Sequence, residues 1–333
     1  MTATRRGLAL GALGLSGLAA SGCAPTARAG AATEFKCVDV HPADYPTVEA
    51  VKWMGDELSR LTDGRLGVRQ FPAGQLGTED DSIGLTRFQA VDVCRVAVAA
   101  LNNAFPETRI LALPYVFRSV AHVRAVVDGP IGTDLLNVFE ERGLVGLAYY
   151  DAAPRSFYNV RRPVAEPGQL RGLKIRAPQS DIFLESIRAM GANPTPLTFG
   201  AVFSSLQTHL IDGAENNWPS YQSSRQFEVA RHWSDTQHSF SPDALLMSKA
   251  SLERLSAADR DLVRDVARRS VRVMRPLWDA RETEARAKVV EAGTVVTQVD
   301  RDAFVASVKP VLDRHLADPV LARLHDRVTT TAG

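Results

Sequence analysis

The sequence has 333 residues, of which 45% are hydrophobic, and its 39 basic and 38 acidic side chains leave a formal net charge of +1. Because single hydrophobic cores stop growing near ~250 residues, we expect a chain of this length to form two lobes. A charge so close to neutral lacks the basic excess that binds phosphate backbones, so no nucleic-acid partner is expected.

The N-terminal residues 1–31 have the features of an export signal. Arg5 and Arg6 precede an apolar run over residues 8–20, which is too short for a ~20-residue membrane span. The paired arginines fit either the twin-arginine route or the general secretory route. Residues 20–23 also resemble a lipoprotein cleavage box, and cleavage before Cys23 would leave a lipid anchor there. The sequence therefore predicts a periplasmic mature protein, with or without that anchor.

The first part of the mature chain alternates strand and helix patterns. We predict strands over 35–41, 66–71 and 91–99, and helices over 47–61 and 79–88, from their periods of two and of 3.6 residues. This order makes a βαβαβ unit and indicates an α/β fold.

A long amphipathic helix is predicted near the C-terminus, over residues 256–292. Its apolar positions keep helical spacing, and Pro276 predicts a kink inside it. We expect one lobe to comprise 33–153 plus 242–281, and the other to comprise 154–241 plus 282–333.

The most informative motif is the strand pattern that ends at Arg176. Leu173 and Ile175 alternate with Lys174 and Arg176, and Pro178 ends the strand. Arg176 therefore stands at the carboxyl end of its strand, where open α/β sheets bind ligands. Its planar guanidinium matches a carboxylate with two parallel hydrogen bonds. A surface ion pair is the alternative interpretation of a single arginine.

Two further motifs follow in the same α/β unit. An Asn-Pro-Thr-Pro run leads to Phe199, and an Asp-Gly-Ala-Glu run ends in Asn216 and Asn217. A cation, an aromatic ring and a pair of amides at neighbouring strand ends predict a site for a small polar anion.

An ordered set of motifs resembles the periplasmic solute receptors of TRAP transporters, the DctP-type family. The run Gly172–Arg176, the turn Gly191–Pro196 and the loop Asp212–Asn216 recur there in this order. Other stretches agree: His41 followed by Tyr45-Pro-Thr, Asp63-Gly-Arg, Phe71–Glu79, Leu113–Phe117, and Ser224–Ala230 followed by His238.

The resemblance implies a two-lobed α/β receptor, each lobe a mixed sheet flanked by helices, with the long helix spanning both lobes. Such a receptor binds an organic acid and delivers it to a small and a large membrane permease subunit. In the family, the arginine that corresponds to Arg176 is the principal carboxylate ligand. The amide and aromatic positions correspond to Asn216 and Phe199, and a second arginine corresponds to Arg155.

The run Glu215–Tyr221 and the residues around Arg95 most resemble the branch that binds uronates and related sugar acids. In that branch Glu79 would accept hydrogen bonds from hydroxyl groups. The remaining residues of the expected ligand site are Arg95, Asn217, His41 and His238. Several positions depart from the branch, among them Ala201, His209 and Gln237, so a C4-dicarboxylate receptor stays open as an alternative.

Two other classes of function compete with this interpretation: a different two-lobed periplasmic binder, for example of amino acids, and an exported hydrolase. The mature chain has no Gly-x-Ser-x-Gly motif, which favours a binding protein over a serine hydrolase, although spacing does not exclude glycosidase carboxylates. The sequence has no Cys-x-x-Cys or His-Glu-x-x-His motif, so we expect neither a metal nor a cofactor.

Overall fold

The computed structural model describes residues 32–151 and 153–333. The predicted export signal over residues 1–31, with Cys23, lies outside these ranges. No helix of the described part is long and apolar enough to cross a membrane.

The first sheet has five strands in the order β2-β1-β3-β10-β4. The strands β1, β2 and β3 are parallel, while β10 runs antiparallel to both β3 and β4. The strands are β1 (Thr33–Val38), β2 (Leu66–Phe71), β3 (Val93–Ala97), β4 (Leu144–Tyr150) and β10 (Asp243–Ser248). With α1 (Pro46–Leu61) and α2 (Glu79–Arg87) between its first three strands, this sheet confirms the predicted βαβαβ unit.

The second sheet has six strands in the order β11-β9-β5-β8-β6-β7, and it also mixes parallel and antiparallel pairs. Its strands are β5 (Arg155–Asn159), β6 (Lys174–Ala177), β7 (Asn193–Pro196), β8 (Gly213–Asn216), β9 (His232–Ser239) and β11 (Val295–Thr297). The expected fold of two mixed sheets flanked by helices is thus confirmed.

Two segments that the sequence predicted as a turn and a loop are strands. The Asn193–Pro196 segment is β7, an edge strand, where a proline without an N–H group costs no ladder bond. The Gly213–Asn216 segment is β8, which lies between β5 and β6 in the interior of the sheet. A central strand holds its side chains more firmly than a loop does, so β8 fixes the positions of Glu215 and Asn216.

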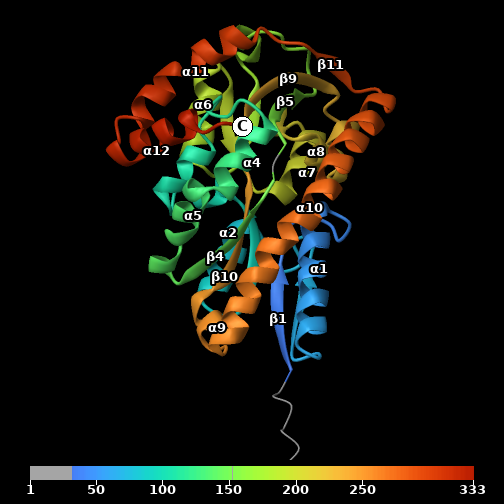
Figure 1. Ribbon diagram of the computed structural model, residues 1–333. Helices are drawn as coiled ribbons and strands as arrows, with labels where there is room; N and C mark the ends of the chain where they lie inside the picture. Colours follow the sequence, from blue (N-terminus) through green and yellow to red (C-terminus); the bar gives the residue numbers. More distant parts are fainter. Residues whose placement is uncertain (1–31, 152) are drawn as a thin grey trace, which may run out of the picture. The chain divides into compact units, whose positions relative to one another are not determined.

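The predicted long helix is confirmed as α10 (Ala257–Glu291), which has 35 residues and remains helical through Pro276. It packs against α1 and β4, and farther along against α8 (Trp218–Ser223). Figure 1 shows α10 running from α9 past α1 toward β11. One helix therefore contacts elements next to both sheets.

The other helices of the described ranges flank the two sheets. They are α3 (Val98–Leu101), α4 (Val120–Asp128), α5 (Pro130–Asn137), α6 (Asp181–Ala189), α7 (Val202–Gln207), α9 (Lys249–Glu253), α11 (Arg301–His315) and α12 (Pro319–Thr330). α11 packs on α6 and β9, whereas α12 packs on α5 and on the turn that begins at Pro106. The last helix therefore lies against the part of the chain predicted as the first lobe, although the lobe boundary at residue 282 remains a prediction.

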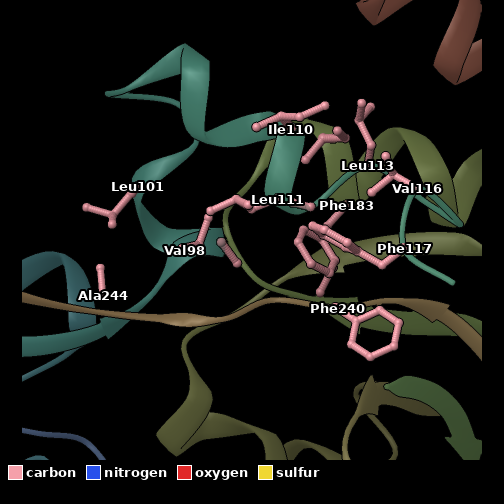
Figure 2. Close-up of a cluster of buried hydrophobic side chains, with 14 of the residues drawn as sticks. Val98, Leu101, Ile110, Leu111, Leu113, Val116, Phe117, Phe183, Phe240 and Ala244 are labelled. Atoms are coloured by element: carbon pink, nitrogen blue, oxygen red, sulfur yellow. The ribbon is translucent and has the colours of Figure 1, made fainter. Parts of the chain in front are cut away.

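The largest apolar cluster joins residues from both predicted lobes. Figure 2 shows Leu111 and Phe117, from the predicted first lobe, together with Phe183 and Phe240, from the predicted second lobe. A second cluster lies between the first sheet, α1 and α10, and a third contains the aromatic side chains around Trp233. The chain thus has a shared core and two local ones rather than one core for each lobe.

Candidate functional site

A cavity of about 500 Å³ lies where segments attached to both sheets meet. Seven of the nine residues predicted for the ligand site line it: His41, Glu79, Arg155, Arg176, Phe199, Asn216 and Asn217. Arg95 and His238 are not among the lining residues. A second cavity of about 850 Å³ shares Glu79, Arg176 and Phe199 with the first.

Arg176 is a buried cation with no carboxylate partner among the described residues. Its strand β6 pairs with β7 and β8, which fixes the backbone on both sides. The side chain is 5% exposed, and its Nε donates to the carbonyl oxygen of Leu197 at 2.8 Å. Burial lowers the pKa of Arg176, because desolvation disfavours the charged form. Its two Nη atoms are thus available for an anion in the cavity.

Arg155 has a different role from Arg176, because it forms an ion pair within the protein. Its Nε and Nη2 donate to the two carboxylate oxygens of Glu215 at 2.6 and 2.8 Å, and its Nη1 donates to Asn216 Oδ1 at 2.9 Å. Burial opposes ionisation of Glu215, but Arg155 and His238 outweigh it and lower the pKa of Glu215 to about 2. Arg155 therefore lines the cavity with most of its donors already bonded.

The amide oxygens of Asn216 and Asn217 are engaged within the protein. Asn216 Oδ1 accepts from Arg155 and from the backbone N–H of Asn217. Asn217 Oδ1 accepts from the N–H of Ser220 and caps α8. These bonds orient both amides so that their Nδ2 groups are the donors without a partner among the described residues. Together with Arg176, they offer donors to an oxygen-rich ligand.

Glu79 supplies an acceptor on the opposite side of the site. It is the first residue of α2, and its Oε1 accepts from the N–H of Ala97 at 2.8 Å. Arg95 Nη1 lies 3.3 Å from the same oxygen. Burial raises the pKa of Glu79. Arg95 itself is fully buried against Asp39, so the structure places it behind Glu79 rather than in the cavity.

Aromatic rings form another side of the cavity. His41 stacks on Tyr45 with ring centroids 3.9 Å apart, and Phe199 meets His41 edge-on at 5.1 Å. Burial lowers the pKa of His41 well below its usual value, so this ring is neutral near pH 7. His41 Nδ1 and Trp278 Nε1 are buried without a hydrogen-bond partner in the described part of the chain. Such groups are usually satisfied by water or a ligand.

His238 supports the site from outside the cavity. Its ring stacks on Phe157, its Nδ1 hydrogen-bonds Thr236, and its Nε2 lies 3.6 Å from Glu215 Oε2. Burial lowers the pKa of His238. Its position favours a structural role beside Glu215 over direct contact with a ligand.

Sequence reasoning missed several residues that line the cavity: Asp151, Ser220, Ser241, Asp243 and Trp278. Trp278 is one of the apolar positions that predict the long helix, and nothing in its local sequence indicates a ligand site. Asp243 begins β10, and only the antiparallel return of that strand places it beside Ala97 at the site. Tyr45 also lines the cavity, and the Tyr-Pro-Thr run that contributes to the TRAP resemblance was the sequence signal for it.

The fold and the site define a solute-binding protein of the two-lobed α/β class. A family model of bacterial extracellular solute-binding proteins, family 7, the DctP family, matches residues 37–318. The chain belongs to this family. The family and the relatives below are described as binding proteins rather than enzymes.

Solved structures of TRAP periplasmic solute-binding proteins are similar over most of the chain. One from Bradyrhizobium sp. BTAi1, in complex with D-galacturonate, is 49% identical with a TM-score of 0.88, and the match covers 90% of this chain and all of that one. One from Citrobacter koseri with bound D-glucuronate is 33% identical with a TM-score of 0.87 and the same coverage. The 2,3-diketo-L-gulonate-binding periplasmic protein of Escherichia coli is 32% identical over 77% of this chain and 78% of its own length.

Proposed function

We propose that this protein is the extracytoplasmic receptor of a TRAP transporter for a uronate or a closely related sugar acid. The observation that carries the proposal is Arg176, a buried guanidinium that lines the cavity and forms no ion pair among the described residues. An uncompensated buried charge is costly, so the site is built for an anion that arrives from outside. The guanidinium fork selects a carboxylate.

The groups around Arg176 support a ligand with several hydroxyl groups. Asn216 and Asn217 present donors, while Glu79 presents an acceptor. A simple dicarboxylate has no hydroxyl donor for Glu79 and would bring a second negative charge near it. The similar structures that hold galacturonate and glucuronate agree with this preference.

The transport role adds three proposals that rest on family membership and on the leader sequence. The receptor is exported by the signal in residues 1–31, through the twin-arginine or the general secretory route. It works in the periplasm, tethered if Cys23 is lipidated. It then hands the sugar acid to the small and large permease subunits.

A competition experiment tests the ligand class. Galacturonate, glucuronate and succinate are titrated into the purified mature protein by calorimetry, alone and against one another. We expect at least one uronate to bind ~10-fold tighter than succinate, because a site that hydrogen-bonds hydroxyl groups is left with unpaired polar groups by a ligand that lacks them. Tighter binding of succinate would assign the receptor to dicarboxylates.

A further inference from the structure

Three carboxylates from separate segments converge on one buried guanidinium beside the cavity. Arg95 on β3 donates from Nε to Asp39 Oδ2 at 2.8 Å, and the pair also makes a second contact. Arg95 Nη1 lies 3.3 Å from Glu79 Oε1 and 3.4 Å from Asp243 Oδ2. One positive charge thus faces three acids that are all held close to it.

No other positively charged group among the described residues near Asp243 is free to offset the negative charge of the three carboxylates. The charged or titratable groups that act on it are Arg95, Glu79, Asp39, Arg155 and the phenol of Tyr45. Arg155 is already paired with Glu215. On the adjoining β4 segment, Tyr150 bonds Ser270 and Asp151 bonds Arg124 and Arg275. Tyr149 stays neutral, because burial raises the pKa of its phenol, which has no hydrogen-bond partner among the described residues.

This arrangement leaves the carboxyl group of Asp243 partly protonated near pH 7. The carboxyl is 7% exposed, and burial, reinforced by Glu79 and Asp39, raises the pKa of Asp243 to about 7. A protonated carboxyl group has an O–H donor as well as an acceptor oxygen. Asp243 is also one of the residues that line the cavity, so that donor is available to a ligand.

A bound sugar acid would change the electrostatics around this carboxyl in one direction. The ligand carries a negative charge into the cavity and displaces water from it. Both changes disfavour the ionised form of a neighbouring acid. The neutral form of Asp243 is therefore stabilised when the ligand is bound.

We propose that Asp243 contacts an oxygen atom of the bound sugar acid as a protonated carboxyl group, and that the receptor takes up a proton from solvent when the ligand binds. The inference rests on the proposed function, because it needs an anionic ligand in this cavity. Its consequence is pH-dependent capture: affinity is retained below pH 7 and falls above it. When binding is coupled to the uptake of one proton, the affinity can fall by at most ~10-fold per pH unit.

Calorimetry with galacturonate tests the proposal. Binding is measured from about pH 6 to about pH 9 in pairs of buffers with different ionisation enthalpies, which report the protons exchanged. The wild type is expected to take up a growing fraction of a proton above pH 7 while its affinity falls. Asp243→Asn should take up none and keep a flat pH profile. Asp313→Asn is the matched control and should behave as the wild type, because Asp313 is exposed on α11 and pairs with Lys309.

The outcomes separate this inference from the proposed function. Binding of galacturonate by the wild type without proton uptake contradicts the inference and leaves the receptor assignment intact. A pH profile of Asp243→Asn that matches the wild type also contradicts the inference and leaves the receptor assignment intact. A second variant, Glu79→Gln, removes one neighbouring negative charge and should move the onset of uptake to lower pH, which tests the cluster if Asp243→Asn does not fold. If glucuronate binds and galacturonate does not, glucuronate replaces it in these measurements. Absence of binding of both uronates at every pH contradicts the proposed function, and the inference with it.

Discussion

Arg176 and Arg155 are both expected from the sequence as ligand arginines, and they differ sharply in the structure. Both are buried and both line the cavity. Arg155 has Glu215 as a partner, and its pKa is raised, whereas the pKa of Arg176 is lowered by desolvation. The difference separates an arginine that holds the site together from one that is ready for a ligand.

Replacement of Arg176 should weaken ligand binding strongly without unfolding the protein. Loss of a desolvated charge partner costs about 2 to 5 kcal/mol, which is a ~30-fold to several thousand-fold loss of affinity. Arg176→Ala is expected in this range, and Arg176→Lys should also bind poorly because an ammonium group lacks the fork. Calorimetry with the best uronate gives the affinities, and circular dichroism checks the fold. Binding within threefold of wild type in either variant would remove Arg176 from the site.

Glu215→Gln should destabilise the protein, because it leaves the charge of Arg155 buried without its partner. Breaking a buried ion pair costs about 3 to 5 kcal/mol. Urea denaturation at pH 7 measures the loss in free energy of unfolding. Glu228→Gln is the control, since Glu228 pairs with Arg225 at the surface and should change stability by less than ~1 kcal/mol.

The ion pair of Glu215 and Arg155 also predicts how the free energy of unfolding depends on pH. The pKa of Glu215 falls from 4.5 to about 2 on folding, so its contribution is complete above pH 4.5 and is lost as the pH falls toward 2. The gap between wild type and Glu215→Gln should therefore narrow in acid. A gap that stays constant down to pH 3 would show that the carboxylate is not stabilised by folding.

At the scale of elements, β8 is the strand on which the site depends. It carries Glu215 and Asn216, and it lies between β5 and β6. Close packing explains why this strand contains Gly213. A Cβ atom there would lie 2.4 Å from the carbonyl oxygen of Tyr158 and 2.8 Å from the side chain of Ile175.

Gly213→Ala is expected to destabilise the second sheet and weaken ligand binding together. Overpacking of this kind costs about 1 to 3 kcal/mol, and the shift of β8 would displace Asn216. Thermal unfolding and calorimetry measure the two effects. Gly67→Ala in β2 is the matched strand control, because no atom lies within 4 Å of its added Cβ. A Gly213→Ala protein as stable as that control would contradict the packing argument.

His209 has a backbone conformation that residues other than glycine rarely adopt. The resemblance to TRAP receptors implies glycine at this position, whereas His209 has a φ of 56°, in the left-handed region that favours glycine. The chain therefore tolerates a non-glycine residue at a strained position, at a cost of ~1 to 2 kcal/mol.

At the scale of the whole molecule, one ligand would have to contact groups from segments attached to both sheets. Glu79 and Asp243 belong to segments of the first sheet, while Arg176 and Asn216 belong to the second. The chain passes between the sheets near Ala153 and near Ser241, and α10 packs beside both. These crossings are the expected hinges, with α10 as a brace.

Ligand binding should therefore close the cleft, as in hinge-type receptors. Small-angle scattering with and without saturating uronate should give a smaller radius of gyration in the presence of ligand. Arg176→Ala in the same ligand concentration should show no change. An unchanged radius in the wild type, with binding verified by calorimetry, would mean that the two lobes do not move.

The sequence by itself determined the class of fold, the long helix and seven of the residues that line the cavity. These features depend on local periodicity and on motifs around Arg176 and Asn216. Both can be recognised in the sequence without knowing any long-range contact. Tertiary structure alone decided which charges pair. Arg95 and Arg155 meet their acids across strands far apart in the chain, and Asp243 reaches the site only because β10 returns antiparallel beside β3. Whether an arginine is neutralised depends on those non-local neighbours, and no local pattern encodes them.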